Sequence, residues 1–161
     1  MICALLATVV SLSAGAATPG TNAVSRITSR SADFDRNEGV IMFEGSVKVD
    51  YPGYVMHSDQ LFVFLQNTNR LSRVVALGNV VITNEQRVGY CGRATYNRLE
   101  NEVVMYPSKR GDMVKLADYG DKKSEVEGEK ITFWLDIEHV EIVNSRITVQ
   151  QGEGDKRRIL P

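Results

Sequence analysis

The sequence predicts an all-β fold of the sandwich, roll or barrel type, and three observations lead to this prediction. Apolar and polar residues alternate over most of the chain after residue 25, with Val, Ile, Phe and Tyr at the apolar positions, which is typical of strands. Turn residues interrupt this alternation roughly every 8–12 residues. A block of pattern also recurs along the chain, and no segment of helical length carries a convincing helical period.

The recurring block reads "MHSDQLFV" at 56–63, "GYCGRATY" at 89–96 and "VEGEKITF" at 126–133, with a fainter copy, "ITSRSADF", at 27–34. Its corresponding apolar positions are Ala32, Leu61, Ala94 and Ile131, which lie 29, 33 and 37 residues apart. A period of this length indicates one supersecondary unit stacked on itself, in which each copy buries a face that its neighbours complete. We therefore expect the function to belong to the stack.

The first 25 residues are expected to precede the folded domain. Residues 2–17 form an uncharged apolar run that ends in the small residues of a signal-peptidase site, so residues 1–17 are predicted to be a secretory signal peptide. No basic residue precedes the run, which leaves open an uncleaved N-terminal anchor or a true start further upstream. The remaining divisions are a polar linker at 18–25, the β domain at 26–150 and a polar C-terminal tail at 151–161.

Within the β domain, strands and turns are expected to alternate. The segments with period-two alternation are 27–34, 45–51, 56–63, 78–83, 89–96, 130–135 and 139–149, the last with a break. Pro52-Gly53 fits a type II turn, and further turns are expected at 67–69, 84–86, 97–98 and 110–112. Gly45 and Gly78 each lie inside a strand-like run, 33 residues apart, which predicts that the sheet bends at the same place in successive layers.

The charged and polar residues do not predict an enzyme, a metal site or a cofactor. The net charge of −1, from 19 basic and 20 acidic residues, gives no electrostatic reason to expect nucleic acid. His57 and His139 lie far apart, outside metal-binding spacings, and are expected on the surface. The acidic residues are too dispersed to support a hydrolase with paired carboxylates. Cys91 is expected to be a small, partly buried filler, with a reactive thiol as the alternative.

Some predicted strands are apolar on both faces. Phe62 and Phe64 alternate with Leu61 and Val63, and Trp134 points away from its apolar neighbours if its strand is regular. A sheet with one solvated face needs only one apolar face, so the second one needs a cover. That cover is the other half of a sandwich, a neighbouring protomer or a lipid.

Two further motifs carry a resemblance to a known family. The strand motif G-[NS]-V-x-[VI] occurs at Gly45–Val49 and Gly78–Ile82, and it is followed by a second strand motif at Ser58–Val63 and, more weakly, at Gly92–Tyr96. In order and period, over about residues 26–150, these motifs resemble the OstA-like (LptA) family of lipopolysaccharide transport proteins. Pro107 and Ser108 stand where that family often has a glycine.

The resemblance implies a V-shaped, twisted β-jellyroll that is open at both ends. Such rolls stack edge to edge into a trough that carries lipid acyl chains across the periplasm, without bond chemistry. The expected partners are lipopolysaccharide or a related glycolipid, homologous β-jellyroll proteins of the inner- and outer-membrane transport complexes that join by edge-strand pairing, and further copies of the chain. An uncleaved leader would anchor the protein in the inner membrane, in an LptC-like role.

The residues expected to face the lipid groove are those in the alternating apolar phase of the strands. They are Val47, Val49, Leu61, Val63, Val80, Ile82, Ala94, Tyr96, Ile131 and Phe133. The alternative function is a structural β-roll that serves as a scaffold or assembly module of the cell envelope. That alternative predicts an interior filled by side chains and no bound lipid.

Overall fold

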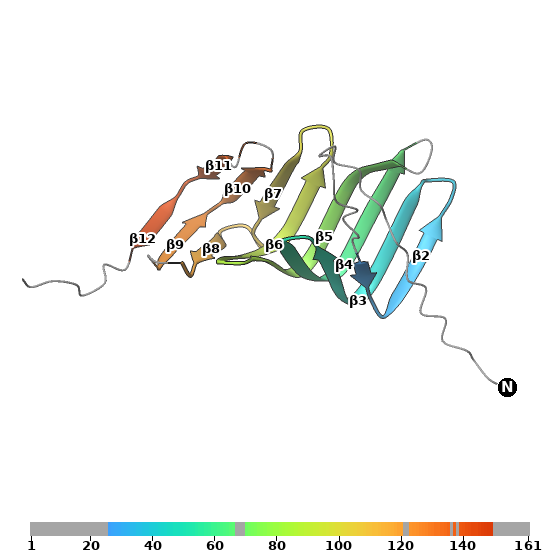
Figure 1. The fold of residues 1–161 in the computed structure, drawn as a ribbon, viewed down its shortest axis with the longest axis horizontal. Coiled ribbons are helices and arrows are strands. Elements are labelled where there is room, and N and C mark those ends of the chain that lie inside the picture. The colour runs from blue at the N-terminus through green and yellow to red at the C-terminus, as the bar shows by residue number, and fades with distance from the viewer. Residues whose placement is uncertain (1–25, 67–69, 121–122, 136, 138, 150–161) are drawn as a thin grey trace, which may run out of the picture.

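The computed structural model describes residues 26–66, 70–120, 123–135, 137 and 139–149. These residues form twelve strands joined in one antiparallel sheet, which confirms the all-β prediction (Figure 1). The described part of the chain contains no helix and therefore none that is long and apolar enough to cross a membrane. The predicted signal peptide, linker and C-terminal tail lie outside the described residues.

The strands follow one another in a meander. They are β1 (Arg26–Thr28), β2 (Ser31–Asp35), β3 (Val40–Tyr51), β4 (Tyr54–Gln66), β5 (Arg70–Asn84), β6 (Arg87–Asn97), β7 (Glu102–Tyr106), β8 (Val114–Asp118), β9 (Ser124–Gly128), β10 (Lys130–Trp134), β11 (His139–Val143) and β12 (Arg146–Val149). The main order across the sheet is β1-β3-β4-β5-β6-β7-β10-β11, with β2 beside β3 and with β8, β9 and β12 continuing from β6.

A single bend divides the sheet into two walls. Wall A contains β2, β7, β10, β11 and residues 40–44, 60–66, 70–77 and 93–97 of the long strands. Wall B contains β1, β8, β9, β12 and residues 47–51, 54–57, 80–84 and 87–91. The long strands β3 to β6 cross the bend unbroken, and elsewhere two short strands take the place of one long strand. The chain thus makes eight traverses of a V-shaped β-jellyroll.

Pairs of left-handed residues make the bend in β3 and β5. Gly45 (φ 80°) is followed by Ser46 (φ 50°), and Gly78 (φ 75°) is followed by Asn79 (φ 46°). The pairing register slips at both places, as it does at a β-bulge. Asn79 is held in this conformation by a hydrogen bond that its Nδ2 donates to Oδ2 of Asp59, at 2.8 Å. The predicted bend at equivalent glycines is confirmed.

The other traverses bend where the strand is interrupted. Arg30 lies between β1 and β2, and its backbone N–H donates to the carbonyls of Glu44 (3.1 Å) and Gly45 (2.9 Å). Pro107 and Ser108 follow the end of β7, and the chain leaves the sheet until β8 begins. The bend is therefore a property of the whole sheet, made by a bulge in some traverses and by a break in others.

The register places the recurring positions of the sequence in one row. Ala32, Leu61, Ala94 and Ile131 are linked across the sheet through Phe43, Ala76 and Met105, which occupy the intervening strands. Most members of this row belong to one buried hydrophobic cluster. The 29-, 33- and 37-residue spacings thus reflect alternate strands of a single antiparallel sheet.

Gly92 provides a test of how closely two backbone segments pack at the bend. A Cβ atom at Gly92 would lie 2.3 Å from the Cα of Ser108, so Gly92→Ala requires two backbone segments to separate. We expect it to lower the free energy of unfolding by about 2–3 kcal/mol, measured by urea denaturation. The control is Gly120→Ala, whose Cβ would meet only side-chain atoms of Asp118 and Gln86 at 3.1 Å. Equal losses of stability in the two variants would contradict the packing argument.

Candidate functional site

The inner faces of the two walls form the candidate site. Nine of the ten predicted groove residues lie in or pack against one hydrophobic cluster that draws on both walls. The tenth, Tyr96, pairs with Val74 and Val103 of the same cluster. The structure therefore brings together all the residues that the alternation selected.

The walls contact each other through bulky side chains that face glycines. A Cβ atom at Gly89 of wall B would lie 2.8 Å from the Cε of Met105 in wall A. A Cβ atom at Gly128 of wall B would lie 2.5 Å from a methyl group of Ile142 in wall A. Because the glycines leave room for these side chains, the two walls approach closely near the bend.

Burial divides the predicted groove residues into two groups. Six of them are at most 4% exposed, and they are Val47, Leu61, Val63, Val80, Ala94 and Ile131. Those that are half-buried are Val49, Ile82, Tyr96 and Phe133. All of the buried group except Val63 lie in the rows next to the bend, where side chains fill the interior. Val63 lies one row further out, in the same row as the half-buried Tyr96 and Phe133.

Sequence reasoning missed the inner residues of the intervening strands. Ile41, Phe43, Ala76, Met105 and Val114 belong to the buried core but lie outside the recurring block that guided the prediction. The alternation in "VIMFEG", at 40–45, would have identified the first two. Ala76 and Met105 are surrounded by apolar neighbours in the sequence, so their phase is visible only from the register of the sheet, whereas Val114 alternates with Lys115 and Leu116 over a segment too short to stand out.

Two small polar side chains occupy the bottom of the V. Ser58 is 5% exposed, and its Oγ has no hydrogen-bond partner among the described residues. Cys91 is buried beside Val80, and burial raises the pKa of its thiol from 9.0 to about 12, against a smaller lowering by a backbone hydrogen bond of Arg93. The prediction of a filler at Cys91 agrees with this placement, because a thiolate is strongly disfavoured there.

Tyr96 is a half-buried residue of wall A that carries a polar group. Its hydroxyl donates to Oδ1 of Asn101, at 3.3 Å. Burial raises the pKa of Tyr96, and Tyr51 raises it further, while Arg98 lowers it. Tyr51 ends the wall B part of β3, so the environment of the Tyr96 hydroxyl includes a group of the opposite wall.

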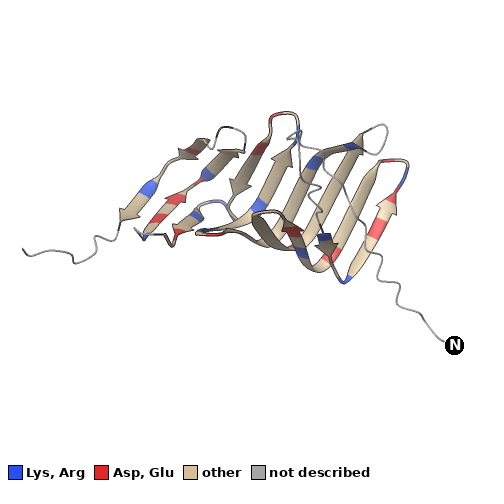
Figure 2. Cartoon of the chain, in the orientation of Figure 1, with Lys and Arg blue, Asp and Glu red and all other residues tan. Residues whose placement is uncertain are grey.

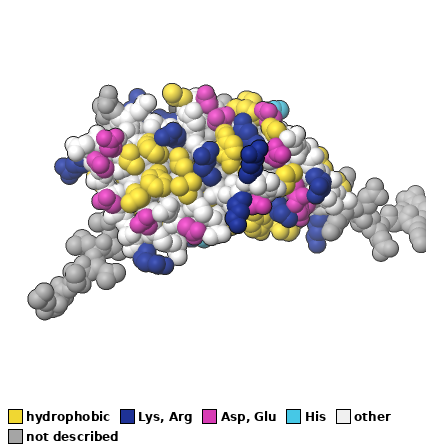
Figure 3. All heavy atoms as spheres, turned by 180° about the vertical axis from the view of Figure 1, so that it is seen from behind, with side chains coloured by type: hydrophobic (Ala, Val, Ile, Leu, Met, Phe, Trp, Pro, Cys, Tyr) yellow, Lys and Arg dark blue, Asp and Glu magenta, His cyan; other side chains and the backbone are white. Residues whose placement is uncertain are grey.

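The outer faces carry the remaining aromatic and charged groups. On wall A, the guanidinium carbon of Arg73 lies 4.2 Å from the ring centre of Phe64, and Trp134 lies 5.2 Å from the ring of His139. The cover that Phe64 and Trp134 need thus comes partly from neighbouring side chains. Figure 3 shows hydrophobic side chains gathered on the face seen from behind, with Lys and Arg beside them.

No catalytic or metal-binding group is assembled in the part of the chain that the structure describes. His57 and His139 are both exposed and lie on different walls. Within the described ranges, no three His, Cys, Asp or Glu side chains are placed to hold a metal ion. Basic and acidic residues are interspersed along the sheet rather than gathered in blocks (Figure 2).

Both ends of the sheet present strand edges. At one end β1 and β2 pair only with β3, within the described residues. At the other end β11 pairs only with β10, and β12 pairs only with β9. Edges of this kind present backbone N–H and C=O groups that can pair with a further strand.

Comparisons with known proteins agree with this architecture. Residues 26–138 match a protein-family model described as "LptA/(LptD N-terminal domain) LPS transport protein". A similar solved structure is that of LptH from Pseudomonas aeruginosa, described as the LptA homologous periplasmic component of the conserved lipopolysaccharide transport device. It is 20% identical, with a TM-score of 0.63, and the match covers 79% of this chain and 94% of that one, which shows the fold. A search of curated proteins found no match.

Cys91 gives a test of how tightly the bottom of the V is closed. Because the thiol is protonated when folded up to about pH 12 but ionises near pH 9 when unfolded, the free energy of unfolding should fall as the pH rises above 9. Below pH 9 this residue should cause no pH dependence. The measurement is urea denaturation between pH 8 and pH 10.5 in a Cys3→Ser background, compared with the same protein carrying Cys91→Ala. An identical pH dependence in the two proteins would show that Cys91 is accessible.

Ser58 gives a second test. Its unpartnered Oγ is held away from water, so Ser58→Ala should leave stability unchanged or raise it by up to about 1 kcal/mol. The control is Ser72→Ala, because Oγ of Ser72 donates to the carbonyl of Phe64 at 3.1 Å, and its loss should cost about 1 kcal/mol. Thermal and urea denaturation measure both. If Ser58→Ala lost as much stability as Ser72→Ala, the hydroxyl of Ser58 would have to form a hydrogen bond in the folded protein.

Proposed function

The chain belongs to the LptA/LptD N-terminal-domain family of lipopolysaccharide transport proteins, and from this premise we propose a non-enzymatic role in the periplasm. In this proposal the protein shelters the acyl chains of lipopolysaccharide, or of a related glycolipid, between walls A and B during transport to the outer membrane. Transfer of this kind makes and breaks no covalent bond, so it requires no nucleophile, base or metal.

The observation that carries the proposal is the continuous apolar inner face of the V. Rows of inner residues run from β2 to β11 in wall A, and others run from β1 to β12 in wall B. Each acyl CH₂ that moves from water to such a surface gains about 0.8 kcal/mol. An acyl chain laid along a row would meet apolar side chains from one strand after another.

The half-buried inner residues are the proposed first contacts of the lipid. Val49, Ile82, Tyr96 and Phe133 keep part of their surface exposed, and an acyl chain would meet that part first. The residues nearest the bend are packed against one another, so a lipid reaches them when the walls separate. When an acyl chain enters, contacts between the two walls would thus be replaced by contacts with the lipid.

The two strand edges are the proposed contacts with protein partners. β1 and β2 at one end, and β11 and β12 at the other, each have one side that no described strand occupies, and an antiparallel or parallel strand could be added there. Homologous β-jellyroll proteins of the inner- and outer-membrane transport complexes, or further copies of this chain, would then extend the apolar interior from one unit to the next. Inner-membrane anchoring by residues 1–17 remains part of the proposal as the LptC-like variant.

One observation favours the second candidate, a scaffold with a filled core. Six of the ten predicted groove residues are at most 4% exposed, which is the burial of an ordinary protein interior. A scaffold would keep these contacts permanently, whereas a lipid carrier would open them. The two functions therefore differ in what touches the inner residues during export.

Photo-crosslinking from adjacent residues of one strand separates the two functions. Ile82 and Phe133 face inward, while their neighbours Val81 and Trp134 face outward, and all four are half-buried. A photo-reactive amino acid at Ile82 or Phe133 should capture lipopolysaccharide in living cells, because these side chains border the groove. The same amino acid at Val81 or Trp134 should capture several-fold less, and immunoblotting for the lipid measures both.

The outward positions act as controls for non-specific contact with membrane lipid. Capture at Val81 and Trp134 with none at Ile82 and Phe133 would overturn the groove assignment. Absence of lipid at all four positions, with the folded protein present in the periplasm, would favour the scaffold.

A further inference from the structure

A pocket at the rim of wall A combines basic and apolar side chains. It has a volume of about 830 Å³ and is lined by residues at the β4–β5 connection and at the turn after β6. The lining residues are Leu65, Gln66, Arg70, Leu71, Ser72, Arg98 and Leu99. Its size is within the range of small-molecule sites, which is roughly 300–1,000 Å³.

The pocket borders the apolar interior. Leu65 and Leu71 both pack against the hydrophobic cluster between the walls, and they also line the pocket. The side chains of these two leucines are thus shared by the hydrophobic cluster and the pocket at the rim of wall A. The pocket is the polar end of an otherwise apolar surface.

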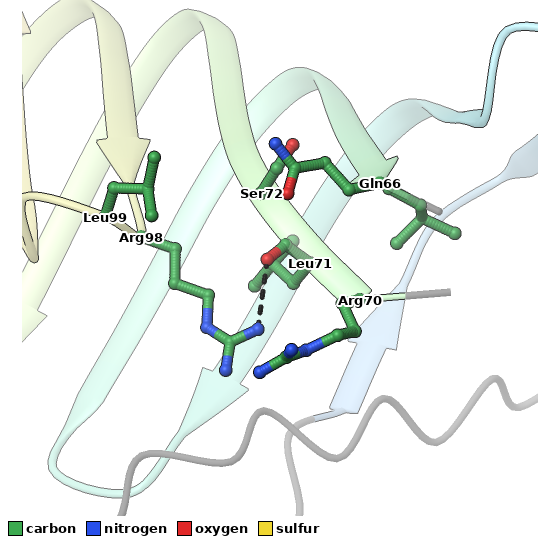
Figure 4. A pocket seen from close by; sticks show the side chains of 7 residues that line it. Gln66, Arg70, Leu71, Ser72, Arg98 and Leu99 are labelled. Atoms are coloured by element: carbon green, nitrogen blue, oxygen red, sulfur yellow. Dashed lines mark hydrogen bonds between the residues drawn. The ribbon is translucent and has the colours of Figure 1, made fainter. Parts of the chain in front are cut away.

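Two arginines converge on this space. Figure 4 shows the guanidinium groups of Arg70, from β5, and Arg98, from the turn after β6, pointing toward one another beside Leu71. Arg98 is held in position because its Nη1 donates to the carbonyl of Leu71, at 3.3 Å, and its backbone N–H donates to the carbonyl of Ser72, at 3.1 Å. Among the described residues that line the pocket, none is acidic.

The charge and shape of this pair match a phosphate-type anion. An anion between the two guanidinium groups could accept hydrogen bonds from both. Guanidinium forks bind the oxygens of a tetrahedral phosphate in pairs, and a phosphomonoester carries a charge of about −1.5 to −2 at neutral pH. The surrounding leucines lower the local dielectric and strengthen such contacts.

We propose that Arg70 and Arg98 bind the phosphate-type anionic group of an amphiphile whose acyl chains lie between walls A and B. This inference rests on the proposed function and adds a polar subsite to it. The apolar part of the ligand would pass Leu65 and Leu71, and the anionic group would remain at the rim. The subsite would thus fix the orientation of the ligand in the groove.

Equilibrium binding of two lipids by the full chain tests the proposal. The probes are bisphosphorylated lipid A and the same lipid after enzymatic dephosphorylation, with inorganic phosphate as a third probe. The unsubstituted protein should bind the phosphorylated lipid about tenfold more tightly than the dephosphorylated one, and Arg70→Gln and Arg98→Gln together should abolish this preference. Inorganic phosphate should bind far more weakly, because it lacks the acyl chains.

A matched double variant controls for the loss of positive charge. Lys109→Gln with Arg110→Gln removes two exposed charges from the loop after β7 and should leave the preference unchanged. Since Arg98 also bonds to the backbone, Arg70→Gln alone is measured too, and it should lower the preference without changing the melting temperature.

Each remaining outcome overturns a stated part of the inference. Equal affinity for the two lipids in the unsubstituted protein, or an unchanged preference in the double arginine variant, would overturn the phosphate subsite and leave lipid binding intact. Inorganic phosphate binding as tightly as the lipid would show a site for free anion instead. Failure of both lipids to bind would overturn the proposed function together with the subsite.

Discussion

The bend that every traverse makes along one line is the constraint on which the rest of the structure depends. A flat sheet of these strands would have two separate faces and no interior. In β3 and β5 the chain turns by placing two successive residues in the left-handed region, one of them a glycine. For Ser46 and Asn79 this conformation costs roughly 1–2 kcal/mol each, which the contacts between the two walls must offset.

The inner row next to the bend mixes small and large side chains. Ala76 and Ala94 are flanked there by Leu61 and Met105, and all four are buried. One row further out, Val63 is buried, but Tyr96 and Phe133 in the same row are only half-buried. Packing is therefore complete next to the bend and incomplete one row away, and a ligand would compete least with protein contacts at Tyr96 and Phe133.

Local signals in the sequence predicted much of this architecture. The φ angles of Gly45 and Gly78 follow from local chemistry, and the shared row of Leu61 and Ala94 follows from period-two alternation within one antiparallel sheet. The depth of burial did not follow, because it depends on how far apart the walls stand. The pairing of Arg70 with Arg98 was also not predicted, since neighbouring strands bring them together from separate turns.

The even number of traverses has a consequence for how the domain is connected. The first traverse runs from the free rim of wall B to that of wall A, and each later one reverses this direction. With eight traverses, Arg26 and Val149 both lie at the rim of wall B, at opposite edges of the sheet. An odd number would have put them at different rims. Because the number is even, the polypeptide enters and leaves the described domain at the rim of wall B. Arg70 and Arg98 lie at the other rim, that of wall A.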